Sequence, residues 1–192
     1  YHLLAGYGLL GCCRAMFANR ISYAFDWNGP SYAIDTACSS SLAALHQAIL
    51  AIRNGECDSA IVGGLNLLLD PANALHFYRL NMLSNNGKCK AFDITADGYA
   101  RAEAVVAIYL QKATAARRMY ATVMNTIVNT DGYKPEGITY PNGSIQYQML
   151  HEVYSKIGLD PRHVVYMEAH GTGTKTGDPE ELAAIDKLLC KD

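Results

Sequence analysis

Cys38 is the first residue whose surroundings could support chemistry. It lies in the run Asp35–Ser41 (DTACSSS), where a short β-compatible segment meets a helical pattern. At the start of a helix, unpaired backbone N–H groups and the positive end of the helix dipole favour a thiolate. The same N–H groups can stabilise an oxyanion. A lone cysteine can equally be a small buried apolar residue, so the position alone makes Cys38 a candidate nucleophile.

His170 opens a loop of glycine and threonine within the run 168–174 (EAHGTGT), directly after an apolar segment typical of a strand. Such a loop has little bulk and several hydroxyl groups, which suits a polar, elongated ligand. A phosphate-binding loop would need glycine directly before Lys175, where Thr174 stands, so that interpretation fails. The ordinary alternative for His170 is a hydrogen-bonded core histidine at a strand end.

Taken together, Cys38 and His170 point to one kind of chemistry. A cysteine at a helix start and a histidine at a strand end, far apart in sequence, are the arrangement expected of Cys/His acyl chemistry. Hydrolases, transferases and condensing enzymes all use such pairs, so the two residues leave these three classes open.

The elements that must position these residues alternate between helical and strand periodicity. Apolar spacing predicts helices over 8–25, 39–53, 71–81 and 144–156 and from Asp178 onward. Asp70 and Ser144 are the expected N-caps, and Asn54-Gly55 is the expected stop of the helix 39–53. Strands are predicted at 31–37, 59–69 (interrupted by Gly63-Gly64), 104–110, 121–130 and 164–168. Strands separated by helices favour an α/β fold with a largely parallel or mixed sheet.

Composition excludes several classes. The chain has 192 residues, 50% of them hydrophobic, and a formal net charge of −2, which argues against nucleic acid or an anionic membrane as the main partner. No apolar run approaches the roughly 20 residues of a membrane span. The six cysteines form no C-x-x-C pair, so we expect free thiols and a cytoplasmic protein. The six histidines form no H-x-H or H-x-x-x-H pair, so no metal site is expected.

The two reactive runs also carry a family resemblance. Asp35–Ser41 and 168–174 resemble the nucleophile and first-histidine motifs of β-ketoacyl synthases, and the separation of 170 − 38 = 132 residues fits the animal fatty acid synthase branch. Further segments resemble the same family: Ala18–Tyr23, Phe92-Asp93 and Asp97–Arg101. The animal-type branch is favoured by Met82–Ser84, Cys89–Asp93, Tyr140–Gly143 and Ile145-Gln146.

This resemblance implies a thiolase-like fold with layers in the order α-β-α-β-α, normally in a homodimer. It implies an acyltransferase that moves an acyl group from the phosphopantetheine of acyl carrier protein to Cys38. A malonyl thioester then loses carbon dioxide, and its enolate attacks the acyl group in a decarboxylative Claisen condensation of fatty acid biosynthesis. His170 would assist decarboxylation, and Thr172 and Thr174 would contact the pantetheine arm. Local hydrogen bonding is the alternative role for both threonines. No cofactor is expected to bind this segment itself.

Two features depart from the family pattern. The 192 − 170 = 22 residues after His170 contain no histidine, so the family's second histidine motif, Asn-x-Gly-His-x-Glu, is absent, as is its Gly-Phe-Gly loop. We therefore expect residues 1–192 to be the central part of a synthase domain, incomplete at both ends and inactive alone, with halves of about 1–118 and 119–192 and with Tyr1 and Asp192 as cut ends. Relatives commonly carry glycine where Ala104 follows Glu103, and alanine is disfavoured there only if the backbone needs a positive φ.

Three alternatives remain open at this point. A ketosynthase of a polyketide synthase would share the fold and the motifs. A truncated remnant with only a structural role would lack catalysis. A Cys/His hydrolase would cleave thioesters without releasing carbon dioxide.

Overall fold

A computed structural model describes residues 6–190 of the chain, so Tyr1 and Asp192 lie outside the described residues. The chain forms two compact units. The first comprises the residues up to Leu65 together with Ala104–Thr122, and the second comprises Asn66–Glu103 and the residues from Val123 onward. None of the helices between residues 6 and 190 is long and apolar enough to cross a membrane.

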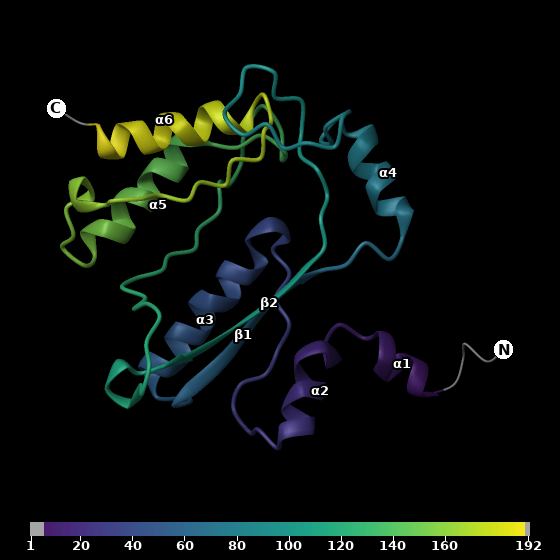
Figure 1. Cartoon of the computed structure of the whole chain (residues 1–192), viewed down its shortest axis with the longest axis vertical. Coiled ribbons are helices and arrows are strands. Elements are labelled where there is room, and N and C mark those ends of the chain that lie inside the picture. Colours follow the sequence, from purple (N-terminus) through teal and green to yellow (C-terminus); the bar gives the residue numbers. More distant parts are fainter. Residues whose placement is uncertain (1–5, 191–192) are drawn as a thin grey trace. The chain divides into compact units, whose positions relative to one another are not determined.

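The first unit combines helices with a strand pair, and α3 lies alongside β1 and β2 (Figure 1). Its elements are α1 (Gly6–Cys12), α2 (Met16–Phe25), η2 (Ala37–Ser39), α3 (Ser40–Asn54), β1 (Ser59–Asn66), β2 (Ala104–Gln111) and η3 (Ala113–Ala115). The predicted end of α3 is confirmed, because Gly55 has a φ of 75° and its N–H closes the last turn on Ala51 O and Ile52 O. The small core of this unit consists of Ala43, Ile49, Ala51, Ile52 and Val62.

The single helix predicted over 8–25 is wrong, because the chain turns between α1 and α2. At this turn Met16 N donates to Cys13 O at 3.0 Å and Phe17 N donates to Arg14 O at 3.0 Å. Bonds of this i→i−3 type tighten the backbone without a glycine or proline. Apolar spacing continues through such a turn, so the sequence pattern does not mark it.

The second unit is mainly helical, with α4 (Pro71–Arg79), α5 (Gly143–Ser155), η4 (Pro161–His163) and α6 (Gly177–Leu189), and α5 and α6 pack against each other (Figure 1). The predicted N-cap Asp70 is confirmed, since its Oδ1 accepts from Ala72 N at 2.8 Å. The predicted cap Ser144 is wrong. Asn142 caps α5 instead, with its Oδ1 accepting from the backbone N–H of Ser144 at 3.0 Å and of Ile145 at 3.2 Å.

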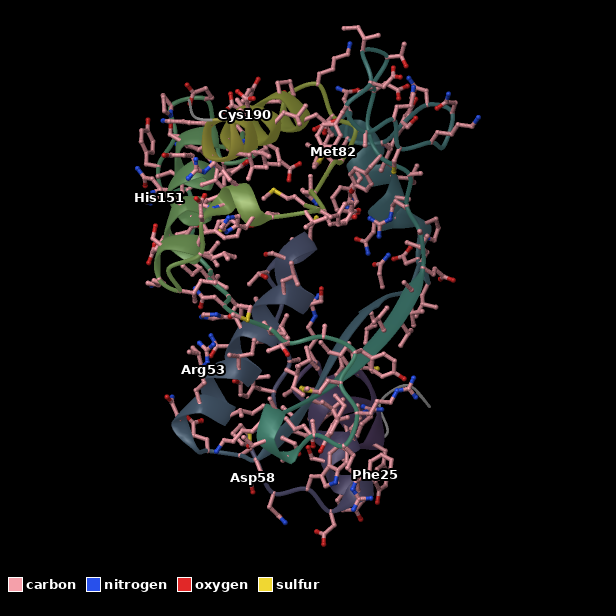
Figure 2. The ribbon with its side chains drawn as sticks, turned by 60° about the vertical axis from the view of Figure 1, so that its left-hand side comes forward. Phe25, Arg53, Asp58, Met82, His151 and Cys190 are labelled. Atoms are coloured by element: carbon pink, nitrogen blue, oxygen red, sulfur yellow. The ribbon has the colours of Figure 1, made fainter. Side chains whose placement is uncertain are left out.

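Figure 2 gives landmarks for each unit. Phe25 ends α2, Arg53 lies in the last turn of α3 and Asp58 immediately precedes β1, all in the first unit. Met82 follows α4, His151 lies on α5 and Cys190 follows α6, all in the second unit.

Three predicted strands, 31–37, 121–130 and 164–168, contain no strand residue. A strand exists only through a hydrogen-bonded ladder with a neighbour, and β1–β2 is the one sheet among residues 6–190. The composition of these segments is compatible with a β-strand, but composition does not show whether a neighbouring strand is available to pair with them. Segment 121–130 bonds to α5 through Asn125, whose Nδ2 donates to Val153 O at 2.9 Å.

The two predicted strands that do form are β1 and β2. Successive strand residues point to opposite faces, and Val105 and Val106 are 72% and 59% exposed, so both faces of β2 are exposed near its start. β2 begins at Ala104, which is not among the positive-φ residues of the described chain. The alanine that follows Glu103 is therefore unstrained at this position.

Candidate active site

Cys38 lies where the sequence predicts it, at the start of a helix. It is the middle residue of the 3₁₀ turn Ala37–Ser39, which leads directly into α3, and its side chain is exposed. The backbone before it is unusual, because Ala37 has a φ of 58°. This left-handed conformation is uncommon for any residue other than glycine.

A set of short-range hydrogen bonds holds the turn around Cys38. Ser40 Oγ accepts from Thr36 N at 2.8 Å and donates to Ala37 O at 2.6 Å. Ser39 Oγ donates to Thr36 O at 3.0 Å. Asp35 Oδ1 accepts from Ala37 N at 3.2 Å. The small polar residues on both sides of Cys38 therefore fix the backbone of the turn rather than filling space beside the sulfur.

Two further residues support this turn. Arg14, in the turn after α1, donates from Nη1 to Asp35 Oδ2 at 2.5 Å. Gly64 of β1 lies so close to the start of α3 that an added Cβ would be 2.8 Å from Ser41 Cβ. The Gly63-Gly64 pair within a predicted strand is a pattern that could have indicated this close approach. No pattern in the sequence indicated the pairing of Arg14 with Asp35.

His170 lies in the second unit, in a loop that carboxylates of α6 hold by its backbone. Glu181 accepts from the N–H of His170 at 2.6 Å and of Gly171 at 2.8 Å, through its two oxygens. The His170 side chain is exposed. The loop is thus fixed through its main chain while the imidazole faces solvent.

Asp178 completes this support from the first turn of α6. It is only 5% exposed, and its Oδ1 accepts from Gly173 N at 3.0 Å. Its Oδ2 accepts from Phe92 N at 2.6 Å, and Phe92 has a φ of 61°. One buried carboxylate therefore joins the His170 loop to the segment around Phe92. The sequence pattern indicates Asp178 only as the opening of a helix, and neither this role nor that of Glu181 was predicted from it.

Gly173 shows why the loop is rich in glycine. Its φ is 71°, and an added Cβ would be 2.9 Å from Lys90 N. Its carbonyl accepts from Gly98 N at 2.9 Å. The segment that it meets is itself fixed by Lys90, whose Nζ lies 2.6 Å from Asp97 Oδ1. The hydrogen bond from Lys90, together with one from Ser84, lowers the pKa of Asp97.

The two predicted pantetheine contacts, Thr172 and Thr174, lie in this loop with their hydroxyl oxygens 3.0 Å apart. Thr174 Oγ1 also accepts from Gly177 N at 3.0 Å, at the start of α6. Both side chains are half-buried and take part in local hydrogen bonds. In the segment just before the loop, Tyr166 donates from its hydroxyl to Glu168, and this bond raises the pKa of Tyr166.

The predicted site residues thus divide between the two units. Cys38 belongs to the first unit, and His170, Thr172 and Thr174 belong to the second, where the structure brings these three together. Among residues 6–190, no three His, Cys, Asp or Glu side chains are grouped as metal ligands would be. The cysteines of the described chain are all free thiols.

Comparison with known protein families gives two adjoining matches. The model of the beta-ketoacyl synthase N-terminal domain matches residues 2–116, and that of the C-terminal domain matches residues 120–192. A fatty acid synthase of the goose Anser anser anser is 53% identical over 98% of this chain and 53% of its own length. Polyketide synthase 19 of Gibberella fujikuroi is 44% identical over 98% of this chain and 8% of its own length.

Solved structures give the same result. The ketosynthase from module 6 of the bacillaene synthase of Bacillus subtilis matches with a TM-score of 0.91 and 38% identity, over 96% of this chain and 33% of that one. An oxazolomycin ketosynthase domain of Streptomyces albus matches with a TM-score of 0.88 and 42% identity, over 92% of this chain and 32% of that one. The expected thiolase-like fold is therefore confirmed. The chain spans about half the length of the goose relative, and it belongs to the β-ketoacyl synthase family.

Proposed function

We propose that the protein carrying this chain is a β-ketoacyl-[acyl carrier protein] synthase of fatty acid biosynthesis. The observation that carries the proposal is Cys38 in a tightly bonded turn at the start of α3, after a residue with a left-handed backbone. Such a turn exposes the sulfur while directing the backbone N–H groups of the helix start toward the reacting carbonyl. Identity of 53% to a fatty acid synthase supports the substrate class.

The reaction proceeds in two half-reactions. The Cys38 thiolate attacks the carbonyl carbon of an acyl thioester, and the carbon–sulfur bond to pantetheine breaks, so that the pantetheine thiolate leaves as the acyl-cysteine thioester forms. A malonyl thioester then loses its carboxylate as carbon dioxide, and the electrons of the broken bond form an enolate. The enolate carbon attacks the acyl-cysteine carbonyl, a carbon–carbon bond forms, and the Cys38 thiolate is released.

His170 serves the second half-reaction. Its imidazole hydrogen-bonds the thioester oxygen of the malonyl group, where negative charge develops as carbon dioxide leaves. Thr172 and Thr174 contact the pantetheine arm beside it. Glu181 supports this role by fixing the backbone of His170 and Gly171 through its two oxygens.

The domain assignment is part of the same proposal. Residues 1–192 form the central part of a synthase domain, with halves of about 1–118 and 119–192. This assignment is supported by the chain's coverage of about a third of each solved ketosynthase and by family-model matches at 2–116 and 120–192. Because the chain contains no Asn-x-Gly-His-x-Glu motif, we expect the isolated 192 residues not to catalyse condensation.

The partners follow from the reaction. Acyl and malonyl groups arrive as thioesters on the phosphopantetheine of acyl carrier protein, and the segment binds no cofactor of its own. The complete domain acts as a homodimer. A cytoplasmic location is supported by the six cysteines, all of which are free thiols.

The test is covalent loading of Cys38 in the complete protein. Incubation with an acyl thioester should attach one acyl group to the Cys38 peptide, as measured by mass spectrometry. Subsequent addition of malonyl carrier protein should release carbon dioxide and a β-ketoacyl product. Cys38→Ala should abolish loading, whereas Cys12→Ala, which removes an exposed thiol of α1, should leave it unchanged. Acyl labelling that persists in Cys38→Ala would refute the nucleophile, and hydrolysis without carbon dioxide release would indicate a hydrolase.

A second candidate is a ketosynthase of a polyketide synthase. It is favoured by the 44% identity to polyketide synthase 19 and by the ketosynthase structures of the bacillaene and oxazolomycin systems. Product analysis of the complete protein separates the two, because one candidate predicts a fatty acid and the other a polyketide. Absence of any loading would instead support a truncated remnant with a structural role.

A further inference from the structure

The nucleophile turn contains a conformation that needs support. Ala37, directly before Cys38, has a φ of 58°, a region in which the side chain of an L-residue crowds the following carbonyl. A non-glycine residue stays there only where its surroundings hold it. Because Ala37 and Cys38 are adjacent, any relaxation of Ala37 changes the direction of the Cys38 side chain.

Asp35 supplies the support from the segment that precedes the turn. Its Oδ1 accepts the hydrogen bond of Ala37 N at 3.2 Å, which ties the N–H of the left-handed residue to a side chain two residues earlier. Ser40 acts from the helix side, donating to Ala37 O at 2.6 Å. The peptide groups on both sides of Ala37 are thus held by side chains.

Arg14 in turn holds Asp35. Its Nη1 donates to Asp35 Oδ2 at 2.5 Å, so one carboxylate oxygen faces Arg14 and the other faces Ala37 N. The turn that carries Arg14 is itself fixed, because Arg20 Nη2 donates to Leu10 O at 2.9 Å and Arg20 Nε to Met16 O at 3.0 Å, linking α1 to α2. Arg14 is therefore presented from an ordered turn 21 residues before Asp35.

The exposure of this pair indicates what it does. The side chains of Arg14 and Asp35 are 76% and 60% exposed. Ion pairs so exposed contribute little to global stability. Such a contact can act on function by fixing the direction of the Asp35 carboxylate. The oxygen of Asp35 that does not face Arg14 accepts from the N–H of Ala37, the residue before Cys38.

We propose that Asp35 is a positioning residue for Cys38 and that Arg14 orients Asp35 for this role. The proposal rests on Cys38 being the nucleophile of the proposed function. Arg14 and Asp35 touch no reacting atom. They hold Ala37 in its left-handed conformation, and through it they fix the direction from which the Cys38 sulfur meets the thioester carbonyl.

Single-turnover acylation of Cys38 in the complete protein tests the proposal, with loading measured by mass spectrometry against acyl thioester concentration. A misplacement of about 1 Å can cost on the order of 100-fold in rate. We expect Asp35→Ala to lower the maximal loading rate at least about 10-fold, with the half-saturating concentration unchanged. Asp35→Asn, which keeps an acceptor for Ala37 N but loses the charge, should lie between Asp35→Ala and the unchanged protein.

The Arg14 variants separate orientation from folding. Arg14→Gln leaves the bond between Asp35 and Ala37 available and should slow loading about 3-fold or more, while Arg14→Lys, which keeps the charge, should recover most of the rate. Lys156→Gln breaks another exposed pair, with Glu152 on α5, and should change nothing. If Asp35→Ala lowers the unfolding temperature, Arg14→Gln and Arg14→Lys decide the question.

The outcomes distinguish this proposal from the proposed function. If the unchanged protein loads Cys38 and the Asp35 and Arg14 variants load it at the same maximal rate, the positioning role is wrong and the nucleophile stands. If the variants raise only the half-saturating concentration, the pair acts on substrate binding and the proposal is also overturned. If the unchanged protein acquires no acyl group on Cys38, the proposed function itself fails.

Discussion

Asp178 is a buried carboxylate whose removal should disturb the His170 loop. It is 5% exposed, and its two oxygens accept from Gly173 N at 3.0 Å and Phe92 N at 2.6 Å. A hydrogen bond to a charged group contributes about 1.5–3 kcal/mol, so loss of both in Asp178→Ala should lower the free energy of unfolding by about 3–6 kcal/mol. In Asp178→Asn the amide keeps one acceptor but turns an NH₂ toward the other N–H, so we expect at least half of that loss.

Thermal unfolding followed by circular dichroism measures the effect. For a chain of this size, about 2–4 °C per kcal/mol predicts a fall of roughly 6–24 °C in Tm for Asp178→Ala. Glu152→Gln is the matched control, because it removes a carboxylate whose exposed pair with Lys156 should contribute only about 0.3–0.5 kcal/mol. If Asp178→Ala unfolds at the temperature of the unchanged chain, the two bonds contribute no net stability and the reasoning is refuted.

Two further predictions concern the same unit. In Gly173→Ala, a backbone φ of 71° is combined with a new Cβ 2.9 Å from Lys90 N, whereas in Gly87→Ala the φ is 67° and no atom lies within 4 Å of the new Cβ. Both variants should therefore lower the Tm in thermal unfolding, and Gly173→Ala should lower it more. Equal effects would show that the contact with Lys90 is easily relieved. Hydrogen bonds from Arg162 hold the pKa of Asp160 at about 2, so the stabilising contribution of this contact is full above the ordinary carboxyl pKa and is lost as the pH falls toward 2. An NMR titration should show this low midpoint and its rise in Arg162→Gln, and an unchanged midpoint would contradict the assigned cause.

Much of the site could be predicted from the sequence because it depends on local patterns. The position of Cys38 at a helix start, the N-cap Asp70 and the stop at Gly55 follow from residue types a few positions apart. The motif runs around Cys38 and His170 also identified the family. Such features need no knowledge of what lies across the fold, since the bonds that define them close within one turn of chain.

The predictions that the structure contradicts concern helix caps and strands whose hydrogen-bond partners depend on tertiary packing. Both Asn142 and Ser144 can cap a helix, and only the path of the chain into α5 selects Asn142. Segments 121–130 and 164–168 have strand composition, yet a ladder needs a neighbour at hydrogen-bonding distance.

The candidate residues Cys38 and His170, the local elements that carry them and the family could all be predicted from the sequence. The contacts that hold these residues could not: Arg14 binds Asp35, 21 residues away, and Asp178 binds the N–H of Phe92, 86 residues away. An arginine or a carboxylate looks the same in a sequence whether its side chain faces water or a backbone N–H of a distant loop. Only the folded path of the chain brings donor and acceptor within about 3 Å, the distance at which a hydrogen bond forms.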